Sequence, residues 1–176
     1  MALLPIRTLG DPVLRKKAAP VKEVTPELQK LAQDMLETMY DAPGIGLAAP
    51  QVGKSVRLFV LDLSPEDAEE KHPYIFFNPE IIPESEPCEI EEGCLSVPGI
   101  YANVDRPEKI TIKALNIHGE PFEMNGLEGM FSRCIQHELD HLDGILFVDK
   151  LSPADRLLYE SKLKKMARET KGKLKK

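Results

Sequence analysis

Residues 134–144, "CIQHELDHLDG", carry His137, Glu138 and His141 in the order His-Glu-x-x-His. Residues four apart lie on one face of a helix about one turn from each other, so both imidazoles can aim at one point. A carboxylate beside such a pair can take a proton from the water that a bound metal activates. Because the pattern is short and also arises by chance, it predicts a metal site with an ordinary polar helix as the alternative.

The two histidines continue a row of soft apolar side chains. Met130 and Cys134 precede them on the same face of the expected helix, at spacings that follow its turns. Imidazoles in apolar surroundings need polar partners, which favours the metal interpretation. A neighbouring face supplies the core with four residues: Phe131, Ile135, Leu139 and Leu142.

Two histidines leave a third ligand to find, since a catalytic site of this kind usually has three protein ligands. The long zinc-protease pattern fails, because Gly144 fits it but Phe147 stands where its third histidine would be. Glu160 lies 19 residues after His141, near the place of the carboxylate in thermolysin-like enzymes. Its surroundings, however, read as an exposed amphipathic helix.

A cysteine is the remaining candidate, because a thiolate is a strong ligand for iron(II) or zinc. Cys94 lies in "EEGCLSVPG", a glycine-flanked, turn-like segment in which the backbone can approach a ligand closely. Cys134, one turn before His137, is better suited to line a pocket. Cys88 has no evident role.

Three segments in order resemble the peptide deformylases: "GIGLAAPQ" at 44–51, "EGCLSVP" at 92–98 and "QHELDHLDG" at 136–144. The opening "LGDPVLRKKAAPV" is also similar to that family, and the resemblance covers about residues 1–150. One segment alone is weak evidence, whereas three at the family's order and rough spacing are specific. The resemblance implies an α+β fold with mostly antiparallel sheets around a central metal-binding helix.

The resemblance also implies the chemistry. Cys94, His137 and His141 would be the metal ligands, and Glu138 the general acid and base. The family's natural metal is iron(II), with zinc, nickel and cobalt as substitutes, so we expect one divalent ion per chain and Fe2+ in the cell.

The implied substrate is the N-formylmethionyl end of a newly made polypeptide, which yields formate and a free amine. Gln51 and the backbone N–H of Leu95 would hold the formyl oxygen as charge develops on it.

Such a substrate needs an apolar slot for the methionine side chain. Met130 and Cys134 are placed to wall it and Ile45 to close another side, with ordinary core packing as the alternative for each. The resemblance suggests that backbone near Ile45, Gly46 and Gly93 pairs with an extended peptide.

Contacts beyond the methionine stay open. Arg133 puts a charge where a hydrophobic residue is expected at the pocket edge, and facing solvent beside the entrance would explain it. Tyr101 follows the cysteine motif at a place where some relatives carry an arginine that meets the peptide.

Hydrophobic periodicity predicts the elements that position these residues. Residues 25–44 predict a helix that Thr25 caps, followed by a glycine-rich loop and a strand over 56–63. Residues 74–84 read as extended, but Pro79 and Pro83 place them at a sheet edge or in irregular structure. Residues 109–126 predict a hairpin and 127–144 the histidine helix, so one mostly antiparallel α+β domain is expected over 1–150.

Charge is unevenly distributed. Residues 151–176 hold nine Lys or Arg against three acidic residues, a net +6, whereas residues 1–150 carry −12. This stretch, a basic C-terminal helix or tail, is either a solvated helix end or a contact for a polyanion such as ribosomal RNA. No membrane partner is expected, because the longest apolar runs are far too short to cross a bilayer. No DNA partner is expected either.

Three cysteines are an odd number, which argues against a disulfide framework and predicts a cytoplasmic location. Three functions are consistent with the residues: a deformylase, a small metalloprotease that uses Glu160, and a structural-metal or peptide-binding module without activity. The three-segment resemblance favours the first.

Overall fold

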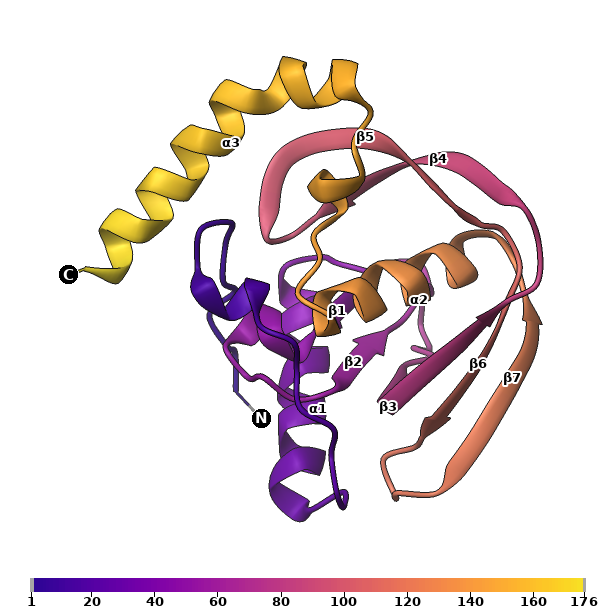
Figure 1. Ribbon diagram of the computed structural model, residues 1–176. Helices are drawn as coiled ribbons and strands as arrows, with labels where there is room; N and C mark the ends of the chain where they lie inside the picture. Colours follow the sequence, from indigo (N-terminus) through magenta and orange to yellow (C-terminus); the bar gives the residue numbers. More distant parts are fainter. Residues whose placement is uncertain (1, 176) are drawn as a thin grey trace.

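Two antiparallel sheets and a helix between them form the core of the computed structural model, which describes residues 2–175 (Figure 1). The larger sheet has the strand order β1-β2-β3-β6-β7, and the smaller one is the hairpin β4-β5. All of these pairings are antiparallel, so the expected α+β class is confirmed. The strands are β1 Gly46–Ala48, β2 Leu58–Leu61, β3 Tyr74–Pro83, β4 Pro87–Cys94, β5 Val97–Pro107, β6 Ile110–Leu115 and β7 Pro121–Leu127. The helices are α1 Pro26–Asp41, α2 Gly129–Leu142 and α3 Pro153–Leu174, with 3-10 turns η1 Pro12–Arg15, η2 Ala49–Val52 and η3 Phe147–Lys150.

The larger sheet is covered on both faces because successive strand residues point to opposite sides. On β2, Phe59 and Leu61 join the apolar cluster of α2, whereas Leu58 and Val60 join that of α1. The strand therefore reads as a continuous apolar run, which is typical of strands buried on both faces.

Helix α1 begins and ends where its sequence predicts. The Thr25 hydroxyl accepts a hydrogen bond from the N–H of Leu28, Pro26 occupies the first turn, and the helix ends at Asp41 before Pro43. Its buried face packs on β1 and β2, and the glycine-rich segment 44–46 follows it in the chain.

The sequence predicts residues 74–84 at a sheet edge or in irregular structure, and the second alternative is the better description, since β3 lies between β2 and β6. Within the described residues only Phe77 pairs on both sides: residues 74–76 pair with β2 and residues 80–83 with β6. The register breaks between Phe77 and Glu80, so Pro79 sits in a bulge where no ladder hydrogen bond is needed. Asn78 adopts φ 50° there, and its amide bonds both the N–H and the carbonyl of Val21.

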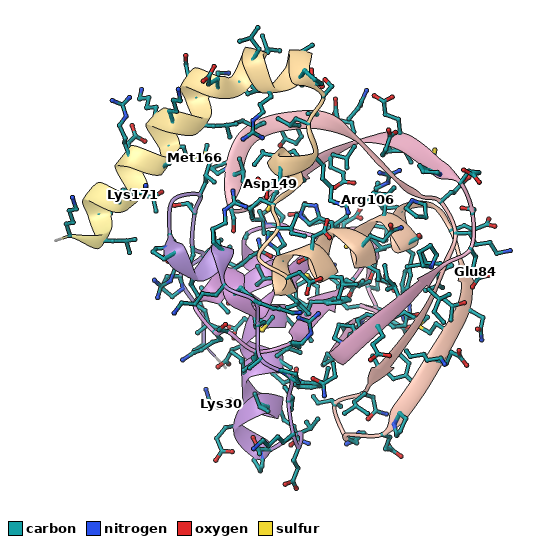
Figure 2. All side chains as sticks on the ribbon, viewed as in Figure 1. Lys30, Glu84, Arg106, Asp149, Met166 and Lys171 are labelled. Carbon is teal, nitrogen blue, oxygen red and sulfur yellow. The ribbon has the colours of Figure 1, made fainter. Side chains whose placement is uncertain are left out.

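Helix α3 packs against the body rather than standing apart from it. Its apolar side chains contact a cluster that includes Val97 and Ile100 of β5 and Phe147 of η3; Figure 2 shows Met166 on the side of α3 that faces the body. These α3 residues are Tyr159, Leu163, Met166 and Ala167. Within residues 2–175 we find no helix with the length and hydropathy that a membrane crossing requires.

Gly144, which follows α2, gives the first testable prediction. It has φ +76°, and a Cβ there would lie 2.6 Å from the carbonyl oxygen of Arg15. We expect Gly144→Ala to lower the free energy of unfolding by about 2–4 kcal/mol, since backbone strain and a backbone clash add. Urea unfolding measures this.

Gly129, at the other end of α2, is the matched control. It has φ +65° but no atom within 4 Å of an added Cβ, so Gly129→Ala should cost only about 1 kcal/mol of strain. Equal costs for the two variants would show that the Arg15 contact does not matter.

Candidate metal centre

The two histidines and a cysteine from another element converge at one point. The ligand atoms of Cys94, His137 and His141 all lie within 4.8 Å of one another. Cys94 is the last residue of β4, where a bulge interrupts the hairpin register, and the histidines lie one turn apart on α2. This is the sulfur and two-imidazole set expected from the sequence.

The geometry fits a metal ion. Donors about 2.0–2.3 Å from one tetrahedral ion are separated by about 3.5 Å, and Cys94 Sγ lies 3.4 Å from His141 Nε2. On His137, Nδ1 lies 3.0 Å from the Glu92 carboxylate, which can only accept a proton when ionised. The hydrogen bond therefore places a proton on Nδ1, so Nε2 is the ring nitrogen that can face the thiolate and hold a metal.

Glu92 is the centre of a buried ionic network. Arg106 bonds both of its oxygens at 2.6 and 2.9 Å, and Arg133 donates to it at 3.1 Å. Burial raises the pKa of Glu92, but hydrogen bonds from His137 and Arg106 outweigh this and hold the pKa at about 2. Figure 2 shows Arg106 beside α2, where it also bonds Asp140 at 2.8 Å.

Arg133 therefore does not face solvent beside the entrance. Its side chain is 4% exposed, and it bonds Glu92 and the carbonyl oxygens of Cys88 and Val104. The charge that the sequence left unexplained ties α2 to both strands of the smaller sheet.

Glu138 lines the same cavity as Cys94 and His137. Its side chain is buried, and burial raises the pKa of its carboxyl to about 7. Oε2 is buried without a hydrogen-bond partner among residues 2–175, so this oxygen is free to bond a water or substrate. The β1 backbone passes so closely that a Cβ at Gly46 would lie 2.8 Å from both Glu138 Oε1 and Cys134 Sγ.

The amide of Gln51 points its nitrogen at the cluster. Its oxygen accepts from the N–H of Ala48 at 2.9 Å, while Nε2 donates to Ser96 Oγ at 3.1 Å and contacts Cys94 Sγ at 3.6 Å. The backbone bond fixes which way the amide faces, because only the oxygen can accept from Ala48.

A cavity of about 410 Å³ opens onto these groups. The sequence-predicted substrate contacts all line it: Ile45, Gly46, Gly93, Met130 and Cys134. Met130 and Ile45 are half exposed at its mouth, whereas Cys134 is buried, and burial holds the pKa of its thiol well above the usual value. Gln51, Leu95, Cys94, His137 and Glu138 line it as well, and so does Tyr101.

The alternative ligand Glu160 does not join the cluster. It is exposed on α3, where it pairs with Lys164 at 2.9 Å. The residues that the sequence did not reveal are Glu92, Arg106 and Ser96. A signal was present in β4, since an acidic residue two positions before a candidate ligand cysteine is a natural partner for a ligand histidine.

This fold and cluster define a candidate metalloenzyme of the His-Glu-x-x-His type with a thiolate as the third donor. The sequence profile of the polypeptide deformylase family matches residues 3–157. The chain is 52% identical over 170 residues to a peptide deformylase of Acinetobacter baumannii (strain SDF), which covers 96% of this chain and 94% of the relative.

Solved structures agree. A peptide deformylase from Legionella pneumophila has a TM-score of 0.85 at 50% identity, over 95% of this chain and 96% of that one. Another from Synechococcus elongatus, in complex with actinonin, has a TM-score of 0.83 at 41% identity, over 90% and 87%. The chain therefore belongs to the peptide deformylase family, enzymes that remove the N-formyl group from nascent peptides.

The Glu92 network predicts a large loss of stability on neutralisation. Glu92→Gln leaves two buried guanidinium groups undercompensated, so we expect the free energy of unfolding at pH 7 to fall by about 3 kcal/mol. The ionised carboxylate stabilises the fold above its unfolded pKa of 4.5 and loses this effect as pH falls towards about 2. The difference from wild type should therefore shrink over that range in urea titrations.

Glu91 supplies the control, because it is the exposed neighbour on β4. Glu91→Gln should change the free energy of unfolding by less than about 0.5 kcal/mol, both at pH 7 and over the acidic range in which Glu92 is protonated. A Glu92→Gln protein as stable as Glu91→Gln would contradict the network's role.

Proposed function

We propose that this chain hydrolyses the N-formyl group from the N-terminal formylmethionine of newly made polypeptides and releases formate. One observation carries the proposal: a thiolate sulfur and two imidazoles converge within 4.8 Å beside the buried Glu138. Membership of the deformylase family supports the same chemistry.

We propose that Cys94, His137 and His141 hold one divalent ion, Fe2+ in the cell, with Zn2+, Ni2+ or Co2+ as substitutes. When bound, such an ion acts as a Lewis acid that makes water a nucleophile near neutral pH. Three protein donors suit catalysis, whereas a structural metal site is normally closed by a fourth. A ligand thiolate also needs a reducing compartment, which supports a cytoplasmic enzyme.

Glu138 is the proton carrier of the reaction. Its carboxylate takes a proton from the attacking water and then passes it to the nitrogen of the leaving amine, so that formate and a free amine result. The unpartnered, buried Oε2 supports this assignment, because Glu138 lines the cavity and no protein donor among residues 2–175 competes for this oxygen.

Gln51 and Leu95 stabilise the oxygen of the formyl group. Because Ala48 holds the Gln51 oxygen, the amide nitrogen faces the site, where it now donates to Ser96 Oγ and contacts Cys94 Sγ. The formyl oxygen takes the place of the long Cys94 contact, and the N–H of Leu95 is the second donor. Loss of one such donor typically costs about 3 kcal/mol, or roughly 10² in rate. The methionine side chain occupies the apolar part of the cavity between Met130 and Cys134.

Separate loss of metal and of activity tests these roles. Glu138→Ala should retain the ion and lower formate release from a formyl-Met peptide by about 10²–10⁴-fold, since it removes the proton carrier. Cys94→Ser should lose both ion and activity. Anaerobic purification, metal analysis and a formate assay measure the two effects, and full activity of Glu138→Ala would refute the mechanism.

We also propose that the basic face of α3 contacts the ribosome. Lys164, Arg168 and Lys171 are exposed and share a face through i, i+4, i+7 spacing. Reversing all three to Glu should weaken ribosome binding and flatten its salt dependence, because fewer phosphate contacts release fewer counterions. Hydrolysis of short peptides should be unchanged.

Reversal of Lys16, Lys17 and Lys22, exposed in the N-terminal segment, makes the same change of charge elsewhere and serves as the control. If both triple variants bind ribosomes equally well in cosedimentation assays at several salt concentrations, α3 is not the contact.

A further inference from the structure

Helix α3 reaches the rim of the cavity through one hydrogen bond. The hydroxyl of Tyr159 on α3 donates to the backbone carbonyl of Tyr101 on β5 at 3.1 Å. In the hairpin, Glu92 pairs with Ala102 and Cys94 with Val97, so residues 98–101 bulge out between these two pairs. The ladder therefore does not fix Tyr101, whereas the bond from α3 does.

The ring of Tyr101 packs on the residue before the ligand cysteine. A Cβ at Gly93 would lie 2.5 Å from Cε1 and 2.7 Å from Cδ1 of that ring, so the side chain lies directly against the Gly93 backbone. The residue is 60% exposed and also lines the cavity. It thus forms part of the cavity wall directly beside the Gly93 backbone.

Helix α3 is a firm support for this contact. Besides the apolar cluster around Leu163 and Met166, Thr8 and Thr170 share a hydrogen bond of 2.7 Å at its far end. The backbone of Ala167 approaches so closely that a Cβ at Gly10 would lie 2.6 Å from its oxygen. The helix is therefore held at several points along its length.

We propose that Tyr159 is a positioning residue for substrate recognition: it holds the Tyr101 carbonyl and so sets the wall that meets the residues after the formylmethionine. The inference rests on the proposed function and deepens it. Contacts between this wall and the downstream residues would be made equally in the ground and transition states, so moving the wall should raise KM for longer peptides and leave kcat unchanged.

Tyr159→Phe tests the proposal by removing only the hydroxyl. For a formyl-Met-Ala-Ser peptide we expect KM to rise about three- to tenfold, the range for one lost hydrogen bond, with kcat unchanged. For formylmethionine amide, which has no downstream residue, KM should rise less than about twofold. Steady-state formate release by metal-loaded enzyme gives both constants.

Thr170→Val is the matched control. It removes another hydroxyl that anchors the same helix, 11 residues further on and about 16 Å along its axis. Thr170→Val should leave the ratio of the tripeptide KM to the formylmethionine amide KM at the wild-type value. If weaker anchoring of α3 were the cause, this ratio would change equally in Thr170→Val and Tyr159→Phe.

A double variant separates positioning from other effects. Tyr101→Ala should raise the tripeptide KM by itself. Tyr159→Phe should then add nothing, because the ring that forms the wall is gone although the backbone carbonyl that Tyr159 holds remains. Additive effects, or a Tyr159→Phe defect equal for both substrates, would overturn the positioning role. Wild type that releases no formate from either substrate would instead overturn the proposed function and this inference with it.

Discussion

The carboxylate of Glu92 joins the two halves of the site. It lies two residues before Cys94 on β4 and bonds Nδ1 of His137 on α2, so one side chain links the thiolate strand to the imidazole helix. A buried carboxylate is costly unless it is fully paired, and Arg106 and Arg133 supply the required charge. The network thus places the Nδ1 proton of His137 and sets the position of α2 together, which neither apolar packing nor the backbone ladder can do.

Close backbone approach is the second constraint on the site. At Gly46 the β1 backbone passes against Glu138 and Cys134, and at Gly93 the β4 backbone passes under Tyr101. A side chain at either position would collide with these neighbouring side chains, so something must shift to admit it. The cavity is therefore lined partly by peptide backbone rather than by side chains.

Elements with a regular hydrophobic period could be predicted from the sequence. Helix α1 and the β6-β7 hairpin follow their apolar patterns, and the three motifs indicated the residues that now converge on one cavity. The β4-β5 hairpin could not be predicted in this way. Its inward positions include the buried charged residues Glu92 and Arg106, which break the alternation of apolar and polar residues. The prolines of β3 correctly indicated an irregular ladder, but Pro79 lies in a bulge inside the sheet and not at its edge. Ion pairs between residues far apart in the sequence produce no local periodic pattern, so they cannot be predicted from periodicity.

Composition and packing give different information about the C-terminal helix. Nine basic residues after position 150 are consistent with a solvated helix end or with a polyanion contact, but the same stretch carries residues 159, 163 and 166 that pack on β5 and η3. One face of α3 therefore presents basic side chains to solvent. The other face packs on β5, the strand that carries Tyr101 of the cavity wall. Removing the helix would change both faces at once, so a defect after truncation could not be assigned to either. Substitutions confined to one face keep the two contributions separate.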